Sequence, residues 1–168
     1  MDEINIEGLR LTALDQIFHP DGDIFHGMKK KDPGYSGFGE AYFSTINTGS
    51  VKGWKKHKKM TLNLVVISGS VKFIIYDDRD NSNSKENFFK VELSLSNFKR
   101  LTVPPGLWLA FKGVSNKKNI ILNIADIEHD TQEIEKLDLG KIDFNWPMLV
   151  SENQTLVNLI KTTIQGKG

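Results

Sequence analysis

The sequence contains no cysteine in its 168 residues, which excludes disulfide bonds, thiolate metal sites and cysteine nucleophiles. It also lacks any apolar run near the roughly 20 residues that a membrane-spanning helix needs. The first residues, MDEINIEGLRL, are acidic and have no basic region followed by an apolar one, so they do not predict a signal peptide. These absences predict a cytoplasmic protein with no membrane partner.

An excess of charge of one sign is also missing, because 22 Lys and Arg residues are balanced by 21 Asp and Glu residues. A net charge of +1 offers no general attraction for nucleic acid, so no nucleic-acid partner is expected. The length suits one domain with a sizeable core. We therefore predict a single domain over residues 1–168, with its core at about 8–146 and a C-terminal extension at about 147–168.

Seven short segments have the composition of strands, because they are rich in Val, Ile, Leu, Phe and Tyr and are bounded by turn residues. They cover residues 37–47, 61–69, 70–78, 88–94, 99–106, 107–113 and 119–127. No helical segment lies between them to make parallel crossovers, so the pattern predicts an antiparallel sandwich or barrel. The run SGSVKF is predicted to be a hairpin turn, with Phe73 and Ile75 on one face of the strand that follows.

Two helical patterns occur late in the chain. Residues 131–137, TQEIEKL, are short and acidic, and residues 152–163 place apolar side chains on one stripe. Both are predicted to be short peripheral helices near the C-terminus.

The stretch GSVKGWKKHKKMTLNLVVISG, residues 49–69, has the spacing of the first motif of the cupin superfamily. In metal-binding cupins this motif supplies two histidines and a glutamate, but Lys55, His57 and Leu62 occupy the three places here. The second motif resembles PPGLWLAF and has Leu109 where a histidine is expected. One imidazole cannot hold an ion that needs three or four protein ligands, so we predict no metal and no other cofactor. The predicted fold is all-β, a cupin jelly-roll barrel.

Lys55 and His57 are two residues apart on an extended segment and therefore share a face, which the metal-cupin analogy directs into the barrel. An inward lysine needs a counter-charge or an anionic ligand. The alternative is that Lys55 lies near the rim and its ammonium reaches water. The neighbouring lysines either form a solvated face or attract a diphosphate, which favours Lys52 as a binding residue.

A closer resemblance covers most of the chain, from about residue 8 to 146. It depends on four pieces: FGEAYFSTINTGSVKGW, TLNLVVISGSVKFIIYDDR, LTVPPGLWLAFKG and NIADIEHDTQEIEKLD. These resemble the dTDP-4-dehydrorhamnose 3,5-epimerase family, a cupin branch that acts on nucleotide-linked 4-keto-6-deoxy sugars. The resemblance implies a jelly-roll barrel, usually a homodimer, with no metal and with the sugar nucleotide bound in the barrel mouth.

The sequence departs from the family at its reactive positions. Epimerisation beside a keto group needs a base, a group that stabilises the enolate, and an acid. The family's histidine base aligns with Lys55, its enolate-stabilising lysine with Asn63, and its second histidine with Leu109. Its tyrosine acid is expected near residues 123–128, which contain no tyrosine.

The candidate catalytic residues are His57 as the base and Lys55 as a positive charge for an enolate or a phosphate. The candidate substrate-binding residues are Lys52, Asn63 and Trp108, whose indole could stack on a base or a sugar. Two structural alternatives remain open. His57 is either a base or a partly buried imidazole bonded to a neighbour such as Asn63, and Trp108 either stacks on a ligand or packs at the barrel mouth.

The leading hypothesis is an epimerase- or isomerase-like cupin that processes a nucleotide-linked 4-keto-6-deoxy sugar for surface polysaccharide, such as lipopolysaccharide. One alternative is a non-catalytic sugar-nucleotide-binding or regulatory cupin that has lost the base. Another is a cupin with an unrelated small ligand.

Overall fold

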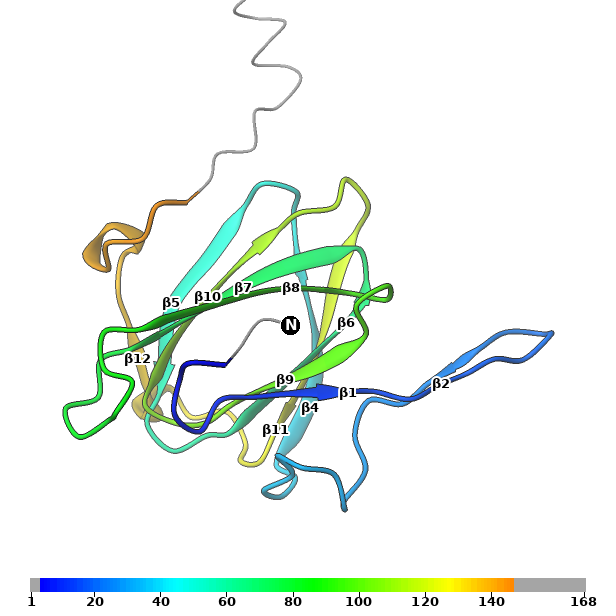
Figure 1. Cartoon of the computed structure of the whole chain (residues 1–168), viewed down its shortest axis with the longest axis horizontal. Coiled ribbons are helices and arrows are strands. Elements are labelled where there is room, and N and C mark those ends of the chain that lie inside the picture. Colours follow the sequence, from blue (N-terminus) through cyan, green and yellow to red (C-terminus); the bar gives the residue numbers. More distant parts are fainter. Residues whose placement is uncertain (1–3, 147–168) are drawn as a thin grey trace, which may run out of the picture.

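A computed structural model describes residues 4–146, which form two five-stranded antiparallel sheets that face each other (Figure 1). The first sheet has the order β1-β9-β6-β11-β4, with bounds Arg10–Ala13, Lys99–Val103, Leu62–Ser68, Asn119–Ala125 and Glu40–Ile46. The second has the order β12-β5-β10-β7-β8, with bounds Ile134–Lys136, Val51–His57, Leu107–Gly113, Ser70–Asp77 and Phe88–Ser94. The architecture is a cupin-like jelly roll, and the prediction of an all-β barrel is confirmed.

The main core lies between the two sheets and follows the two-residue period of the strands. Phe73 and Ile75 lie on one face of β7, as predicted, and this face points into the core together with Leu101 of β9 and Ile121 of β11. All four side chains are completely buried. Burial of such side chains is the main driving force that holds the sheets together.

The outer face of the second sheet carries a separate aromatic cluster. Trp54 of β5 and Trp108 of β10 pack there against Ile74, and Phe144 and Trp146 cover them. The covering segment contains a short 3-10 helix, η2, at Leu139–Lys141. A strand of this sheet therefore buries both faces, which explains why its sequence is continuously apolar at places such as FII in β7.

The connection between β6 and β7 does not form the predicted hairpin. Gly69 has a left-handed φ of 73°, which suits a tight turn, but β6 pairs with β9 and β11 whereas β7 pairs with β8 and β10. The chain thus passes from one sheet to the other at this glycine. The local turn pattern correctly indicated that the chain changes direction here, but it carried no information on which strands β6 and β7 pair with.

The predicted helix at 131–137 is also wrong. Only Thr131–Glu133 form a turn of 3-10 helix, η1, and the residues that follow are β12. β12 pairs with β5 in the register Ile134↔His57 and Lys136↔Lys55. Backbone hydrogen bonds to an open sheet edge override a weak helical pattern of seven residues. The second predicted helix, at 152–163, lies outside the described residues.

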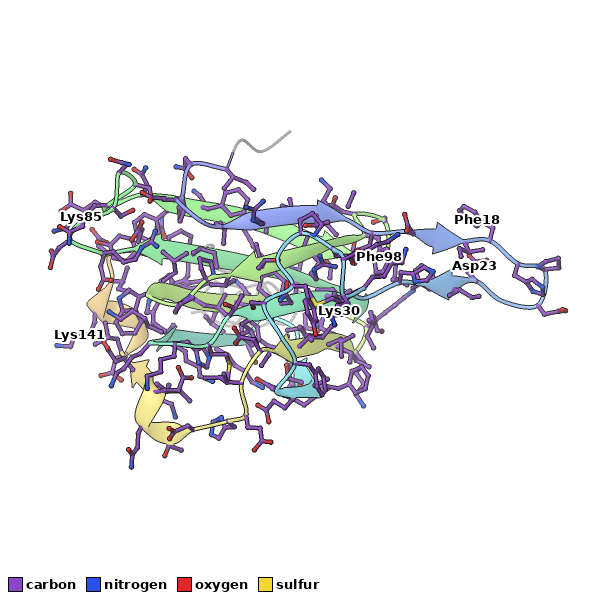
Figure 2. The ribbon with its side chains drawn as sticks, turned by 90° about the horizontal axis from the view of Figure 1, so that it is seen from below. Phe18, Asp23, Lys30, Lys85, Phe98 and Lys141 are labelled. Atoms are coloured by element: carbon purple, nitrogen blue, oxygen red, sulfur yellow. The ribbon has the colours of Figure 1, made fainter. Side chains whose placement is uncertain are left out.

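No helix within residues 4–146 is long and apolar enough to cross a membrane. A narrow hairpin, β2 (Gln16–Ile17) with β3 (Ile24–Phe25), projects away from the barrel (Figure 2). Its apolar side chains are solvent-exposed, with Phe18 at 78% exposure.

A buried carboxylate closes the end of β7. Asp77 accepts hydrogen bonds from the Arg79 guanidinium at 2.8 Å, from Ser82 Oγ at 2.6 Å and from Ser84 Oγ at 2.7 Å. Burial alone would raise the pKa of Asp77, but these hydrogen bonds outweigh it and hold the pKa well below its usual range. Asp77 thus orders the long polar loop that follows β7.

We expect Asp77→Asn to lower the free energy of unfolding by about 3 kcal/mol, because it leaves the Arg79 guanidinium without its charged partner. Urea denaturation at neutral pH measures the change. Asp80→Asn is the matched control, since Asp80 pairs with Lys85 in solvent and its loss should barely move the transition. Equal midpoints for the two variants would contradict a structural role for the Asp77 network.

Candidate functional site

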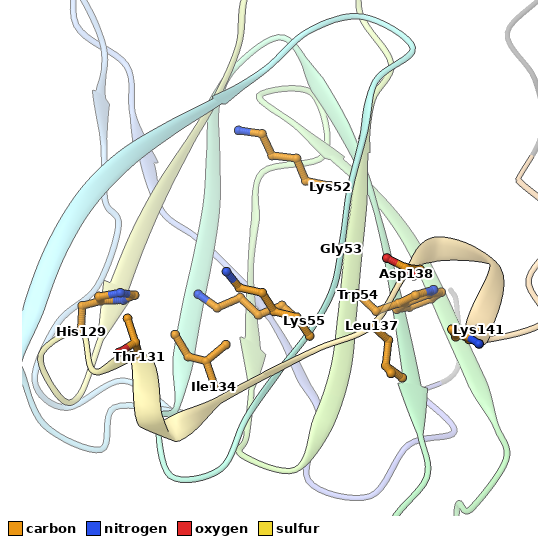
Figure 3. Close-up of a pocket in the computed structure, with 11 residues that line it drawn as sticks. Lys52, Gly53, Trp54, Lys55, His129, Thr131, Ile134, Leu137, Asp138 and Lys141 are labelled. Carbon is orange, nitrogen blue, oxygen red and sulfur yellow. The ribbon is translucent and has the colours of Figure 1, made fainter.

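Two adjoining cavities open along β5, and Figure 3 shows the residues that line the outer one. The outer cavity has a volume of about 900 Å³ and the inner chamber about 200 Å³. Lys52, Gly53 and Lys55 line both of them. These residues therefore stand at the passage from the barrel mouth into its interior.

The inner chamber has an apolar wall and a few polar groups. Leu62, Leu64, Leu109 and Phe111 form the wall. The polar groups are Tyr42, Ser44 and Asn123, together with the two lysines. A small apolar chamber with few fixed polar groups is typical of a site that holds one sugar-sized ligand in a defined orientation.

Strands β4 and β11 place the polar groups of the chamber. Asn123 is buried, and its amide donates to the backbone oxygen of Tyr42 at 3.3 Å and to Ser44 Oγ at 3.0 Å. Tyr42 is 38% exposed, and the burial of the rest of its side chain, assisted by Glu40, raises the pKa of its phenol. The phenol therefore keeps its proton at neutral pH and can donate a hydrogen bond.

The outer cavity is mainly basic. Lys136 and Lys141 line it beside the two lysines of β5, and His129 and Asp138 add an imidazole and one carboxylate. Fixed cations close together attract an anion such as a phosphate. The arrangement supports the prediction that Lys52 belongs to a binding site.

Lys55 lies between these two environments. It is half-buried, and within residues 4–146 its ammonium makes neither a hydrogen bond nor an ion pair. Burial lowers the pKa of Lys55, and Lys136, its register partner on β12, lowers it further against the opposing effect of Glu133. An inward lysine without a hydrogen-bonded or ion-paired partner is suited to a ligand that brings one.

His57 is buried, with 6% exposure, and lines neither cavity. Its Nδ1 is hydrogen-bonded to Glu133 Oε1. The other oxygen of Glu133 accepts from the backbone N–H groups of Lys58 and Lys59 at 3.1 and 3.2 Å. The structure thus favours a structural role for His57 as a buried imidazole bonded to a neighbour, over a role as a catalytic base. The neighbour is Glu133 and not Asn63.

The His57–Glu133 pair has a defined protonation state. Burial lowers the pKa of His57, and nearby Lys55 lowers it further, whereas the hydrogen bond to Glu133 opposes the change. Burial would raise the pKa of Glu133, but the bonds from His57 and from the backbone outweigh it. A neutral imidazole therefore donates Nδ1–H to an ionised carboxylate. Glu133 is 76 residues from His57 in the chain, so no local pattern could pair them.

Asn63 is not part of the cavity. Thr102 Oγ1 donates to its side-chain oxygen at 2.6 Å, and its amide donates to the backbone oxygen of Gly34 at 3.2 Å. Because Leu62 and Leu64 point into the chamber, the strand period turns Asn63 to the outer face of the first sheet. The prediction that Asn63 binds substrate is corrected by this placement.

Trp108 is likewise on an outer face. Its Nε1 donates to Asp78 at 2.7 Å, and the Lys56 ammonium lies 4.5 Å from the centre of its ring. The neighbouring Leu109 points into the chamber instead. Trp108 therefore packs in the outer aromatic cluster, and the prediction that it contacts substrate is corrected.

Four residues of the two cavities are not among the predicted site residues: Tyr42, Asn123, Lys136 and His129. The alternation in the strand at 37–47 could have placed Tyr42 and Ser44 on one face. Lys136 was assigned to a helix, and its place beside Lys55 follows only from the pairing of β12 with β5.

The described part of the chain contains no cluster of three or more His, Cys, Asp or Glu side chains that could hold a metal ion. The absence of a metal stays a prediction from the sequence.

The facing sheets and the cavity between them define a protein of the cupin-like jelly-roll class. Residues 25–161 match the dTDP-4-dehydrorhamnose 3,5-epimerase family, and the chain belongs to this family.

Several known proteins resemble the chain. A probable low-salt glycan biosynthesis epimerase of Haloferax volcanii is 23% identical over 154 residues, which are 86% of this chain and 93% of the relative. The crystal structure of a dTDP sugar isomerase from Desulfovibrio desulfuricans is 32% identical, covers 84% of this chain and 92% of its own, and has a TM-score of 0.81. A Legionella pneumophila 3,5-epimerase, solved with dTDP-4-keto-L-rhamnose, has a TM-score of 0.75 at 16% identity, over 85% of this chain and 80% of its own, and supports the fold.

We expect the folded state to lose about 1 kcal/mol of stability between pH 7 and pH 5 because of His57. The unfolded imidazole binds a proton as the pH falls below about 6.5, whereas the folded one, with its lowered pKa, resists protonation. This contribution is present above pH 6.5 and is lost as the pH falls toward the folded pKa. Urea denaturation across this range measures it.

His57→Gln should flatten the pH profile, since glutamine can donate to Glu133 but does not titrate. His19→Gln, at an exposed site, is the control and should keep the wild-type slope. Parallel profiles for wild type and His57→Gln would show that His57 is not held neutral by the fold.

Proposed function

We propose that this protein exchanges the protons beside the keto group of a nucleotide-linked 4-keto-6-deoxy sugar, as an epimerase or isomerase. The observation that supports it most is the position of Lys55, whose amine stands unpaired at the entrance to the inner chamber. Membership of the epimerase family supports the choice of a keto sugar.

The two cavities suit the two halves of such a substrate. The lysines of the outer cavity, Lys52 and Lys136 among them, would hold the diphosphate by charge-assisted hydrogen bonds. The sugar would then enter the inner chamber, where the protonated phenol of Tyr42 is available to donate to an oxygen. Loss of a proton beside the keto group builds negative charge on that oxygen, and Lys55 and Tyr42 would stabilise it.

In this proposal His57 is a positioning residue and does not touch the substrate. Its bond to Glu133 ties the end of β5 to the start of β12. That connection sets Lys55 beside Lys136.

We expect wild-type protein in D₂O to incorporate deuterium at C3 or C5 of at least one dTDP-4-keto-6-deoxy sugar, as followed by NMR. Lys55→Met should lower the rate of deuterium exchange by roughly 100-fold or more, because it removes the amine that stabilises the negative charge developing on the keto oxygen. Lys85→Met is the control, since Lys85 lines neither cavity and pairs with Asp80 in solvent.

The competing function is a sugar-nucleotide-binding or regulatory cupin without catalysis. Its support is the lysine that replaces the family's histidine at position 55. Tight binding of the sugar nucleotide without deuterium exchange would establish this function and exclude the epimerase.

We further propose that the protein works in the cytoplasm, on a sugar for surface polysaccharide such as lipopolysaccharide. The Haloferax volcanii relative is a probable glycan biosynthesis epimerase, which supports a role in glycan synthesis.

We propose a homodimer on the basis of exposed apolar side chains. They gather on the projecting hairpin and on the edge strand β4: Ile17, Phe18, Ile24, Phe25 and Phe43. A second copy of the chain would cover these side chains and remove the free-energy cost of exposing them to water.

We expect sedimentation equilibrium to give twice the chain mass of 19.0 kDa. Phe18→Ser combined with Phe43→Ser should shift the protein toward monomer, because it removes two of the most exposed rings. Leu137→Ser, at an exposed apolar residue that follows β12 on the opposite side of the barrel from the hairpin (Figure 1), should leave the dimer intact. A wild-type monomer at micromolar concentration would refute the proposal.

A further inference from the structure

The amine of Lys55 differs from those of the other lysines at the cavity. Lys52 is exposed, and its ammonium donates to the backbone oxygen of Thr45 at 2.7 Å. Lys136 is also exposed to solvent. Of these three, only Lys55 is half-buried. It lines the inner chamber beside Leu62 and Leu109 and has no hydrogen-bonding partner among residues 4–146.

We propose that Lys55 acts as a nucleophile and forms an imine with the keto carbon of the substrate. This inference rests on the proposed function, since it needs a keto sugar in the chamber. It assigns Lys55 a covalent role in place of a purely electrostatic one.

The surroundings of Lys55 favour the reactive, unprotonated amine. A lysine becomes a nucleophile toward carbonyl groups when it is desolvated or lies beside another cation. Both conditions hold here, because the leucine wall removes water and Lys136 is the cross-strand neighbour of Lys55. The lowered pKa of Lys55 is consistent with this geometry.

The reaction balances without an oxidant or reductant. The Lys55 nitrogen attacks the keto carbon, the carbinolamine loses one water, and protonation gives an iminium ion. The neighbouring C–H bond then releases its proton, and its electron pair forms a C=C bond while the C=N pair moves to nitrogen. Reprotonation of this enamine on the opposite face, followed by attack of water on the iminium carbon, returns the epimerised ketone and the free amine.

His129 takes the proton from carbon, with the keto carbon held at the passage between the two cavities, where Lys55 stands. It follows β11 and lines the outer cavity with Lys55, and Figure 3 shows the Lys55 side chain extending into the cavity with His129 across from it. An imidazole transfers protons well near neutral pH. His57 cannot act as this base, because it is buried and hydrogen-bonded to Glu133.

Reductive trapping tests the covalent step. Wild-type protein is incubated with dTDP-4-keto-6-deoxyglucose and sodium cyanoborohydride, and the adduct is located by mass spectrometry of the intact chain and of its peptides. We expect one adduct per chain, on Lys55. Lys85→Arg, the control at a lysine that lines neither cavity, should still be labelled at Lys55.

Lys55→Arg is the decisive variant, because arginine keeps the positive charge but forms no imine. It should abolish the adduct and lower deuterium exchange by roughly 100-fold or more, with its circular dichroism spectrum unchanged. His129→Asn should keep the adduct while exchange falls by a similar factor.

The outcomes separate this inference from the proposed function. Exchange by wild type with no adduct, an adduct on another lysine, or Lys55→Arg exchange near the wild-type rate would each overturn the imine and leave the epimerase in place. Binding with neither exchange nor adduct would overturn both.

Discussion

The carboxylate of Glu133 holds together the part of the barrel on which the cavity depends. It receives the His57 imidazole on one oxygen and backbone N–H groups of the turn after β5 on the other. A buried carboxylate is stable only when its lone pairs are satisfied in this way, so the two segments cannot separate without a large cost. The result is that β12 lies along the edge of β5.

That pairing determines the electrostatics of the cavity. It sets Lys136 beside Lys55 and adds the residues after β12 to the wall of the outer cavity. Lys55 therefore stands among cations and apolar side chains.

Strand alternation produces two separate apolar layers, one on the inner faces of the sheets and one on the outer face of the second sheet. Inward residues such as Phe73 and Leu101 build the core, and outward residues of the second sheet build an aromatic layer with Trp54 and Trp108. Residues next to each other in sequence therefore belong to different environments. Leu109 lines the chamber while Trp108 binds Asp78, and Leu64 lines it while Asn63 binds Thr102.

The sequence by itself determined the strand segments, the inward direction of Lys55, the missing metal ligands and the resemblance to the family, because each depends on local composition, spacing or a two-residue period. The tertiary structure decided which strands pair, that residues 134–136 extend a sheet, and which face of β6 and β10 is the inner one. It also decided that Glu133 is the hydrogen-bond partner of the buried His57 and that His129 and Lys136 line the outer cavity. These depend on contacts between residues far apart in the chain, for which a local pattern carries no signal.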